Sequence, residues 1–96
     1  MTDIVAMQSV EPVIFGVVKI LWNDGFAGIV DLRPLLAKGE MFEFLRTSPA
    51  RFDDVKLEEH GHKIFWLDDQ GDEIDFGAES LRQRAERQAG LLHLAS

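Results

Sequence analysis

Apolar residues occur along this chain in short runs, and polar or turn-forming residues separate one run from the next. Residues 13–22 are mostly apolar or β-branched, and residues 26–31 repeat that composition on the far side of Asp24-Gly25. An Asp-Gly pair between such flanks supplies the two positive φ angles of a type I′ turn. The pattern therefore predicts a β-hairpin built from these two strands.

The length of the predicted turn sets the register of this hairpin. A two-residue loop pairs Trp22 with Ala27 and Ile20 with Ile29. One face then carries only apolar side chains, and we expect it to face the core: Val18, Ile20, Trp22, Ala27 and Ile29. The opposite face carries Leu21, Phe26 and Val30 together with Lys19.

Short helices are predicted after the hairpin. Asp31 begins a helix over residues 34–38, whose first turn tolerates a proline and which ends at Gly39. Residues 41–45 predict a short α- or 3₁₀-helix. Residues 48–52 begin with Ser-Pro, which predicts a capping residue followed by a first-turn proline.

A second hairpin and a last helix complete the pattern. Residues 54–58 alternate between charged and apolar side chains and residues 63–67 are strand-like, with a turn at His60-Gly61 between them. Residues 68–72 turn the chain again before the alternating apolar positions Ile74 and Phe76.

The last helix is predicted over residues 78–88, with Gly77 as its cap and Gly90 as its stop. Apolar residues at helical spacing define its buried face: Leu81, Ala85 and Ala89.

These elements predict one α+β domain. We expect a small antiparallel sheet of two hairpins, short helices between the hairpins and a C-terminal amphipathic helix, arranged in two layers. Within residues 1–96, residues 1–12 form an arm or a short edge strand that ends at Pro12. Residues 13–89 form the compact core and residues 90–96 a tail.

The charge of the chain narrows the classes of partner that it can bind. Seventeen acidic and ten basic residues give a formal net charge of −7, which disfavours nucleic acid as a direct ligand and attracts basic proteins. The chain has no cysteine, which excludes disulfides, zinc-thiolate sites and thiol nucleophiles. The first residues lack the basic start of a signal peptide, and no apolar run reaches membrane-spanning length. We expect a cytoplasmic protein without membrane contact.

Several of these residues also resemble a known family. The order of Asp24-Gly25, residues 30–36, Phe42 with Leu45, Phe52, Val55, Trp66, Asp75 and Leu81 is similar to that of the small bacterial "domain of unknown function 2442" family. The resemblance covers about residues 13–84. The chain departs from the family at Ala78, where the family has a proline, and in the longer turn between Trp66 and Asp75.

The resemblance implies a compact α+β domain with an antiparallel sheet and no established activity. It also implies an association with another small protein, in an arrangement similar to a toxin-antitoxin pair. Some members carry a C-terminal helix-turn-helix, which we do not expect in this chain.

Two turns contain residues that could bind metals. Glu58, His60 and His62 occupy alternate positions, which can bring imidazoles and a carboxylate together, but the same residues suit a polar hairpin turn. Residues 68–72 resemble a calcium loop in their alternating acids, but they lack the bidentate glutamate of such loops, which favours a solvated β-turn. We expect no metal and no cofactor.

Trp66 and Arg82 have two interpretations each. Trp66 suits a core position with its indole N–H bonded near a strand end, or an anchor in a partner's pocket. Arg82 lies in the basic part of the last helix with Arg84 and Arg87, where interleaved glutamates predict ion pairs on the helix face. Nucleic-acid contact is the alternative.

The sequence contains no catalytic motif, since nucleophile elbows, phosphate-binding glycine loops and dinucleotide fingerprints are all missing. We therefore expect a non-enzymatic protein-interaction module, the antitoxin-like member of a two-protein system, that binds a protein partner or itself. Its interaction surface is expected to include Trp66, His60, His62 and Arg82. The alternative is a regulatory domain that binds a small molecule or a metal.

Overall fold

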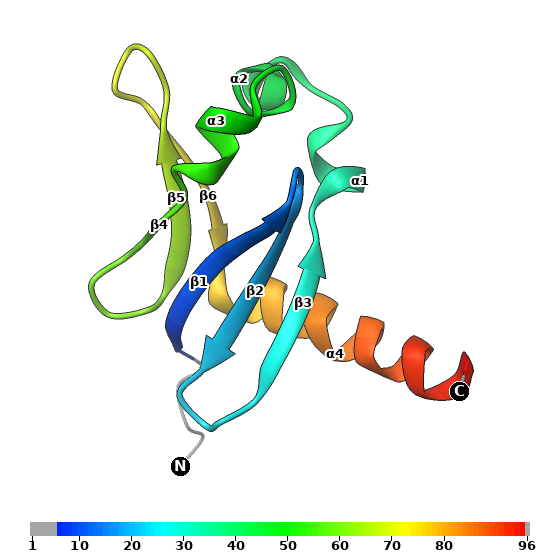
Figure 1. Ribbon diagram of the computed structural model, residues 1–96. Coiled ribbons are helices and arrows are strands. Elements are labelled where there is room, and N and C mark those ends of the chain that lie inside the picture. The colour runs from blue at the N-terminus through cyan, green and yellow to red at the C-terminus, as the bar shows by residue number, and fades with distance from the viewer. Residues whose placement is uncertain (1–5, 96) are drawn as a thin grey trace.

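The computed structural model describes the backbone of residues 6–95 and the side chains of residues 6–90. In chain order the elements are β1 (Met7–Ile14), β2 (Val17–Trp22), β3 (Ala27–Asp31), α1 (Arg33–Leu36), η1 (Glu40–Phe42), α2 (Glu43–Arg46), α3 (Pro49–Asp53), β4 (Lys56–Leu57), β5 (Lys63–Leu67), β6 (Glu73–Gly77) and α4 (Ala78–Ala95). The predicted α+β class is confirmed. The strands form two antiparallel sheets, in the orders β1-β2-β3 and β4-β5-β6, and not a single sheet (Figure 1).

The turn between β2 and β3 differs from the prediction. Only Gly25 has a positive φ, of 91°, so the turn is not type I′. Residues 23–25 form a three-residue loop, which the Trp22 N–H closes by donating to the Phe26 carbonyl at 2.8 Å. The Asp24 carboxylate accepts the Phe26 N–H at 3.1 Å, and this contact stabilises the longer loop.

The extra loop residue shifts the pairing of β3 by one position. Leu21 pairs with Ala27 and Val18 pairs with Val30. Because side chains alternate between faces, a shift of one residue reverses the predicted orientation of the whole strand. The predicted core positions of β2 are confirmed, since Val18, Ile20 and Trp22 are buried, whereas Val30 is buried on β3 in place of Ala27 and Ile29.

The first strand is longer than predicted. β1 continues through Pro12 to Ile14, and the chain turns at residues 15–16, so residues 13–22 are not one strand. Pro12 is tolerated because β1 is an edge strand with a register irregularity beside it. Gly16 has a φ of 88°, and a Cβ there would lie 2.4 Å from Cγ of Arg33, so this turn requires glycine. Residues 1–5 of the predicted arm lie outside the described residues.

The short helices and the second hairpin follow the sequence pattern. α1 begins beside Asp31, whose carboxylate accepts the Arg33 N–H at 3.0 Å, and Gly39 takes a positive φ after the helix. Ser48 caps α3 by accepting the Arg51 N–H at 3.4 Å, with Pro49 in the first turn. These local signals work because each needs only residues that are close in the sequence.

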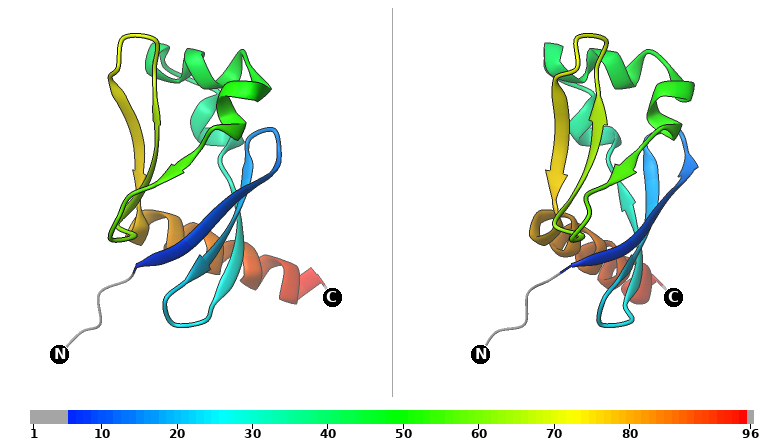
Figure 2. Two further views of the ribbon diagram at one scale, coloured as in Figure 1. Left: turned by 60° about the vertical axis from the view of Figure 1, so that its left-hand side comes forward. Right: turned by 90° about the vertical axis from the view of Figure 1, so that its left-hand side faces the viewer.

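The last helix starts at Ala78 as predicted but does not end at Gln88. It continues through Gly90 to Ala95, so the predicted tail is helical as far as Ala95. Leu81 and Ala85 are buried, whereas Ala89 is exposed. Beyond Ala85 the helix extends past β3, and none of residues 86–90 is buried (Figure 1 and the left view of Figure 2).

The core lies between the two sheets, with the short helices closing one end and the start of α4 closing the other (Figure 2). Both sheets, the short helices and α4 contribute buried side chains to it: Met7, Val18, Ile20, Trp22, Val30, Leu32, Leu36, Leu45, Phe52, Ile64, Trp66, Ile74, Ala78, Leu81 and Ala85.

Candidate functional site

Trp66 belongs to the core and is not part of a surface. Its side chain is 1% exposed, and its indole N–H donates to the Phe52 carbonyl at 2.9 Å. The ring packs against Phe52 and, edge to face, against Phe76. Phe52 is in the last turn of α3, where helix carbonyls lack partners within the helix, so Trp66 satisfies one of them. The core interpretation of Trp66, with its indole N–H bonded, is confirmed, and the alternative of an anchor in a partner's pocket does not fit a side chain that is 1% exposed.

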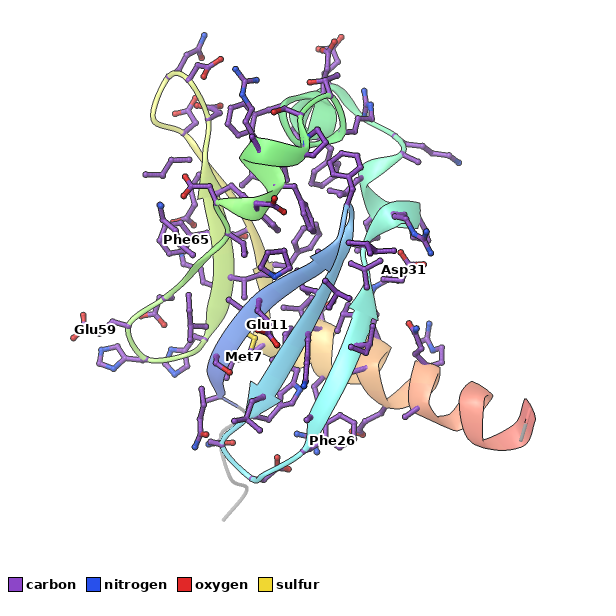
Figure 3. The ribbon with its side chains drawn as sticks, viewed as in Figure 1. Met7, Glu11, Phe26, Asp31, Glu59 and Phe65 are labelled. Atoms are coloured by element: carbon purple, nitrogen blue, oxygen red, sulfur yellow. The ribbon has the colours of Figure 1, made fainter. Side chains whose placement is uncertain are left out.

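Arg82 joins α4 to the first hairpin. Its guanidinium donates two hydrogen bonds to the Asp24 carboxylate, at 2.8 and 3.1 Å, and one to Glu86 at 3.1 Å. It also lies 4.3 Å from the centre of the Phe26 ring, which Figure 3 labels at the start of β3. These contacts leave the side chain 18% exposed. Arg82 is therefore committed to contacts within the domain.

The ion pair between Arg82 and Asp24 changes the acidity of the Asp24 carboxyl group. The pKa of Asp24 lies below its usual value, chiefly because Arg82 donates hydrogen bonds to the carboxylate and also because the Phe26 N–H does. The pair connects residues 58 positions apart, so the helix-face pattern that predicted the Arg82–Glu86 contact could not identify Asp24.

His60 and His62 lie exposed on the turn between β4 and β5, with ring centres 5.9 Å apart. Glu58 is used by the turn itself, because its carboxylate accepts the backbone N–H of His62 at 3.1 Å. Backbone hydrogen bonds from His62 and His60 lower the pKa of Glu58. Glu59 projects from the same turn away from the domain (Figure 3). Among the side chains of residues 6–90, no group of three or more His, Asp or Glu is arranged to hold a metal ion.

A polar cleft of about 410 Å³ lies between the α2 region and the β5–β6 turn. Its lining is mostly charged: Glu40, Glu43, Phe44, Thr47, Arg51, Asp68, Asp69 and Gln70. Its one arginine is already engaged, since Arg51 donates to Asp69 at 3.1 Å and lies 4.4 Å from the centre of the Phe44 ring. Asp68 likewise accepts the backbone N–H groups of Gln70 and Asp72, both at 2.9 Å. Residues 68–72, whose acids resemble those of a calcium loop, thus form the turn that the sequence favours.

The clearest unpartnered feature is the end of the β1–β2 hairpin. Val13, Ile14 and Phe15 are consecutive apolar residues with exposed fractions of 52, 56 and 39%. Phe15 also packs edge to face on the buried Phe52, with ring centres 5.7 Å apart. We name these three residues the hairpin tip. Exposed apolar residues that occur together mark interaction surfaces more often than single ones do.

An apolar cleft of about 180 Å³ lies beside the hairpin tip. Phe15 and Gly16 form one wall, and side chains of the α1 and α2 regions form the other: Arg33, Leu36, Ala37 and Arg46. The two arginines are held by other groups, because Arg33 pairs with Asp31 at 2.8 Å and Arg46 donates to the carbonyls of Leu36 and Gly39. The cleft can therefore accept an apolar side chain while both guanidinium groups keep their hydrogen bonds.

Sequence reasoning missed the hairpin tip because it assigned residues 13–22 to one strand. Gly16 was the available signal, since a glycine within an apolar run often marks a turn. Had the turn been placed there, Val13, Ile14 and Phe15 would have been recognised as a hairpin end.

Comparison of the chain with protein-family models, with curated proteins and with solved structures found no match. Among the described residues, no helix is both long and apolar enough to cross a bilayer.

Proposed function

We propose that this chain is a non-enzymatic protein-interaction module of the cytoplasm, the antitoxin-like member of a two-protein system, and that its hairpin tip binds the partner protein. The resemblance to the "domain of unknown function 2442" family supports the two-protein arrangement. The exposure of Val13, Ile14 and Phe15 beside an apolar cleft supports the choice of surface.

The surroundings of the tip indicate the chemistry of the partner. Exposed carboxylates occur on the two elements that carry the tip and its contact: Glu11 on β1, and Asp53 and Asp54 at the end of α3, where Phe52 contacts Phe15 and Asp54 pairs with Lys56. The net charge of −7 adds a long-range attraction for cations. The partner we propose therefore presents an apolar anchor residue flanked by lysine or arginine side chains.

The test begins with purification of the tagged chain from its native host and identification of any co-purifying polypeptide. That polypeptide is then expressed and purified, and its binding is measured by calorimetry against wild type and against Val13→Ser/Ile14→Ser. We expect the double substitution to weaken binding at least tenfold, because it removes two exposed apolar contacts.

Leu67→Ser provides the matched control, since Leu67 is 47% exposed on the other sheet. This control should bind as wild type does, and both variants should melt near the wild-type temperature. An antitoxin-like role further requires that the partner alone slows growth and that co-expression of this chain restores it. Purification without a companion polypeptide, or equal binding by the tip variant, would refute the proposal.

A further inference from the structure

The edge strands of the two sheets differ in how well they are protected against pairing with an additional strand. Those of β1 and β4 lie against each other inside the domain, and beside them the Met7 N–H donates at 2.8 Å to the carbonyl of Gly61, in the turn that follows β4. A Cβ on Gly61 would lie 2.2 Å from the Met7 carbonyl oxygen, which shows how closely the two segments approach. β1 also carries Pro12 and register irregularities, both of which oppose strand addition.

The edge of β6 is protected by charge. Hydrogen-bonded pairs at Asp68–Asp72 and His62–Ala78 set the alternation of this ladder, so the backbone groups of Glu73 and Asp75 point away from β5. Both residues are acidic and share one cation, Lys63, which leaves a net negative charge on this edge, and Glu73 raises the pKa of the neighbouring Asp75 carboxyl. A second β6 paired about Asp75 would place like charges opposite each other, which disfavours pairing there.

The edge of β3 has none of these protections. The hydrogen bonds between Trp22 and Phe26 and between Leu32 and Gly16 set its alternation, so the backbone groups of Ala27, Ile29 and Asp31 point away from β2. Among the described residues, no other segment bonds to these groups. The strand has five residues, no proline and no lysine. An edge of this kind is suited to strand addition.

We propose that β3 pairs with β3 of a second copy of this chain, antiparallel about a two-fold axis at Ile29, to form a homodimer with one continuous six-stranded sheet. In this register Ile29 faces Ile29 of the second copy, and Ala27 faces Asp31 at each end. Every outward-pointing N–H and C=O of the three residues then bonds across the axis. Shifting the register by two residues loses part of these bonds because the strands no longer overlap fully.

The charges on the residues that face each other across the axis are compatible with this register. The Asp31 carboxylate is paired with Arg33 in its own copy, at 2.8 and 2.9 Å, and Arg33 lowers the pKa of Asp31. Across the axis this neutralised pair faces the methyl side chain of Ala27. No like charges are opposed, in contrast to a β6 pairing, so the β3 edge is complementary to itself.

The part of α4 beyond Ala85 extends past β3 (Figure 1), and it gives the second argument that the partner at this edge is another copy of the same chain. α4 crosses β3 at Gly28, where an added Cβ would lie 2.9 Å from Cβ of Ala85, and none of the described residues beyond Ala85 is buried. In the proposed register, Gly28 faces Val30 of the second copy. The two crossing points are then about 8 Å apart, from strand rises of about 3.4 Å and one strand spacing of about 4.8 Å.

That separation is an upper limit on the distance between the two α4 axes, and it lies close to the spacing of about 8–10 Å between the axes of packed helices. The two α4 helices would therefore run antiparallel beneath the joined sheet. Each helix would cover the part of the other that extends beyond Ala85. The two-fold axis also directs the two hairpin tips to opposite ends of the dimer, which implies two partner proteins per dimer. The dimer itself does not depend on the proposed partner.

Because the chain has no cysteine, Ile29→Cys tests the axis directly. Hydrogen-bonded antiparallel pairs have Cα atoms about 5.5 Å apart, within the range that a disulfide spans. We expect Ile29→Cys to oxidise to a covalent dimer in non-reducing electrophoresis at low micromolar concentration. Leu67→Cys, exposed on the other sheet, should cross-link much more slowly.

Sedimentation equilibrium at 5–500 µM measures the association of the uncross-linked chain, whose monomer has a mass of 10.9 kDa. Wild type should reach twice this mass and associate more tightly at 0.5 M than at 0.05 M NaCl, because salt screens the repulsion between two copies of charge −7. Ile29→Lys should weaken association at least tenfold and Leu67→Lys should not, with circular dichroism confirming that both fold. A monomer at all concentrations, or a dimer that Ile29→Cys fails to cross-link, would overturn the proposal.

Discussion

The hydrogen bond from Trp66 to the Phe52 carbonyl can be isolated because the chain contains a matched second tryptophan. Trp22 is also fully buried, and among the described residues its indole N–H has no hydrogen-bond partner. Trp66→Phe and Trp22→Phe therefore make the same change in shape at two equally buried sites. Only the first removes a hydrogen bond.

The expected difference in stability follows from the polar group that each substitution leaves without a hydrogen-bond partner. In Trp66→Phe the Phe52 carbonyl loses its indole donor, and an unsatisfied buried polar group costs about 1–3 kcal/mol. In Trp22→Phe the substitution removes an N–H that was already unsatisfied. The smaller ring creates a similar cavity in both variants, so that cost largely cancels in the comparison. Trp66→Phe should therefore be about 1–3 kcal/mol less stable than Trp22→Phe, or melt roughly 5–20 °C lower.

Urea unfolding followed by far-ultraviolet circular dichroism measures this difference without relying on tryptophan emission. The two variants and wild type should be compared at one protein concentration, because self-association would raise the apparent stability. Similar slopes with urea would show that all three unfold to a similar extent. Equal stability of the two variants, or a lower stability of Trp22→Phe, would refute the reasoning.

Two further predictions concern the contacts of α4. Gly28→Ala should destabilise the domain by about 1–2 kcal/mol in thermal unfolding, because the new Cβ would lie 2.9 Å from Cβ of Ala85, whereas Gly77→Ala, with no atom within 4 Å, should not. Asp24→Asn should lower stability at neutral pH, since it removes the charge that Arg82 binds. The pKa of Asp24 is lowered in the fold, so this deficit should be constant above about pH 5 and vanish as the pH falls through the folded pKa, in urea titrations from pH 7 to 2. A deficit that does not change with pH would contradict the ion-pair explanation.

Much of the fold was predictable from neighbouring residues. The Ser48-Pro49 start of α3, the positive φ of Gly39 and the turns of the second hairpin depend on interactions within a few positions. The alternation of apolar residues on β2 also identified its buried face. These predictions were confirmed because the responsible interactions are local and do not depend on which element packs above them.

The β3 prediction was wrong for an equally physical reason. The choice between a two-residue and a three-residue loop at Asp24-Gly25 reversed the strand, and two long-range contacts accompany the observed outcome. Arg82 binds Asp24 from 58 residues away, and Gly28 allows α4 to approach the sheet closely. Neither contact leaves a trace in the spacing of residues near the turn.

The sequence by itself determined the α+β class, the positions of most elements and the acidic charge, because composition and short-range periodicity encode them. Tertiary structure alone decided which residues are available for interaction. It buried Trp66, engaged Arg82, exposed the hairpin tip and left the β3 edge open, since exposure depends on which distant segments cover a residue and not on the residue's own neighbours in the chain.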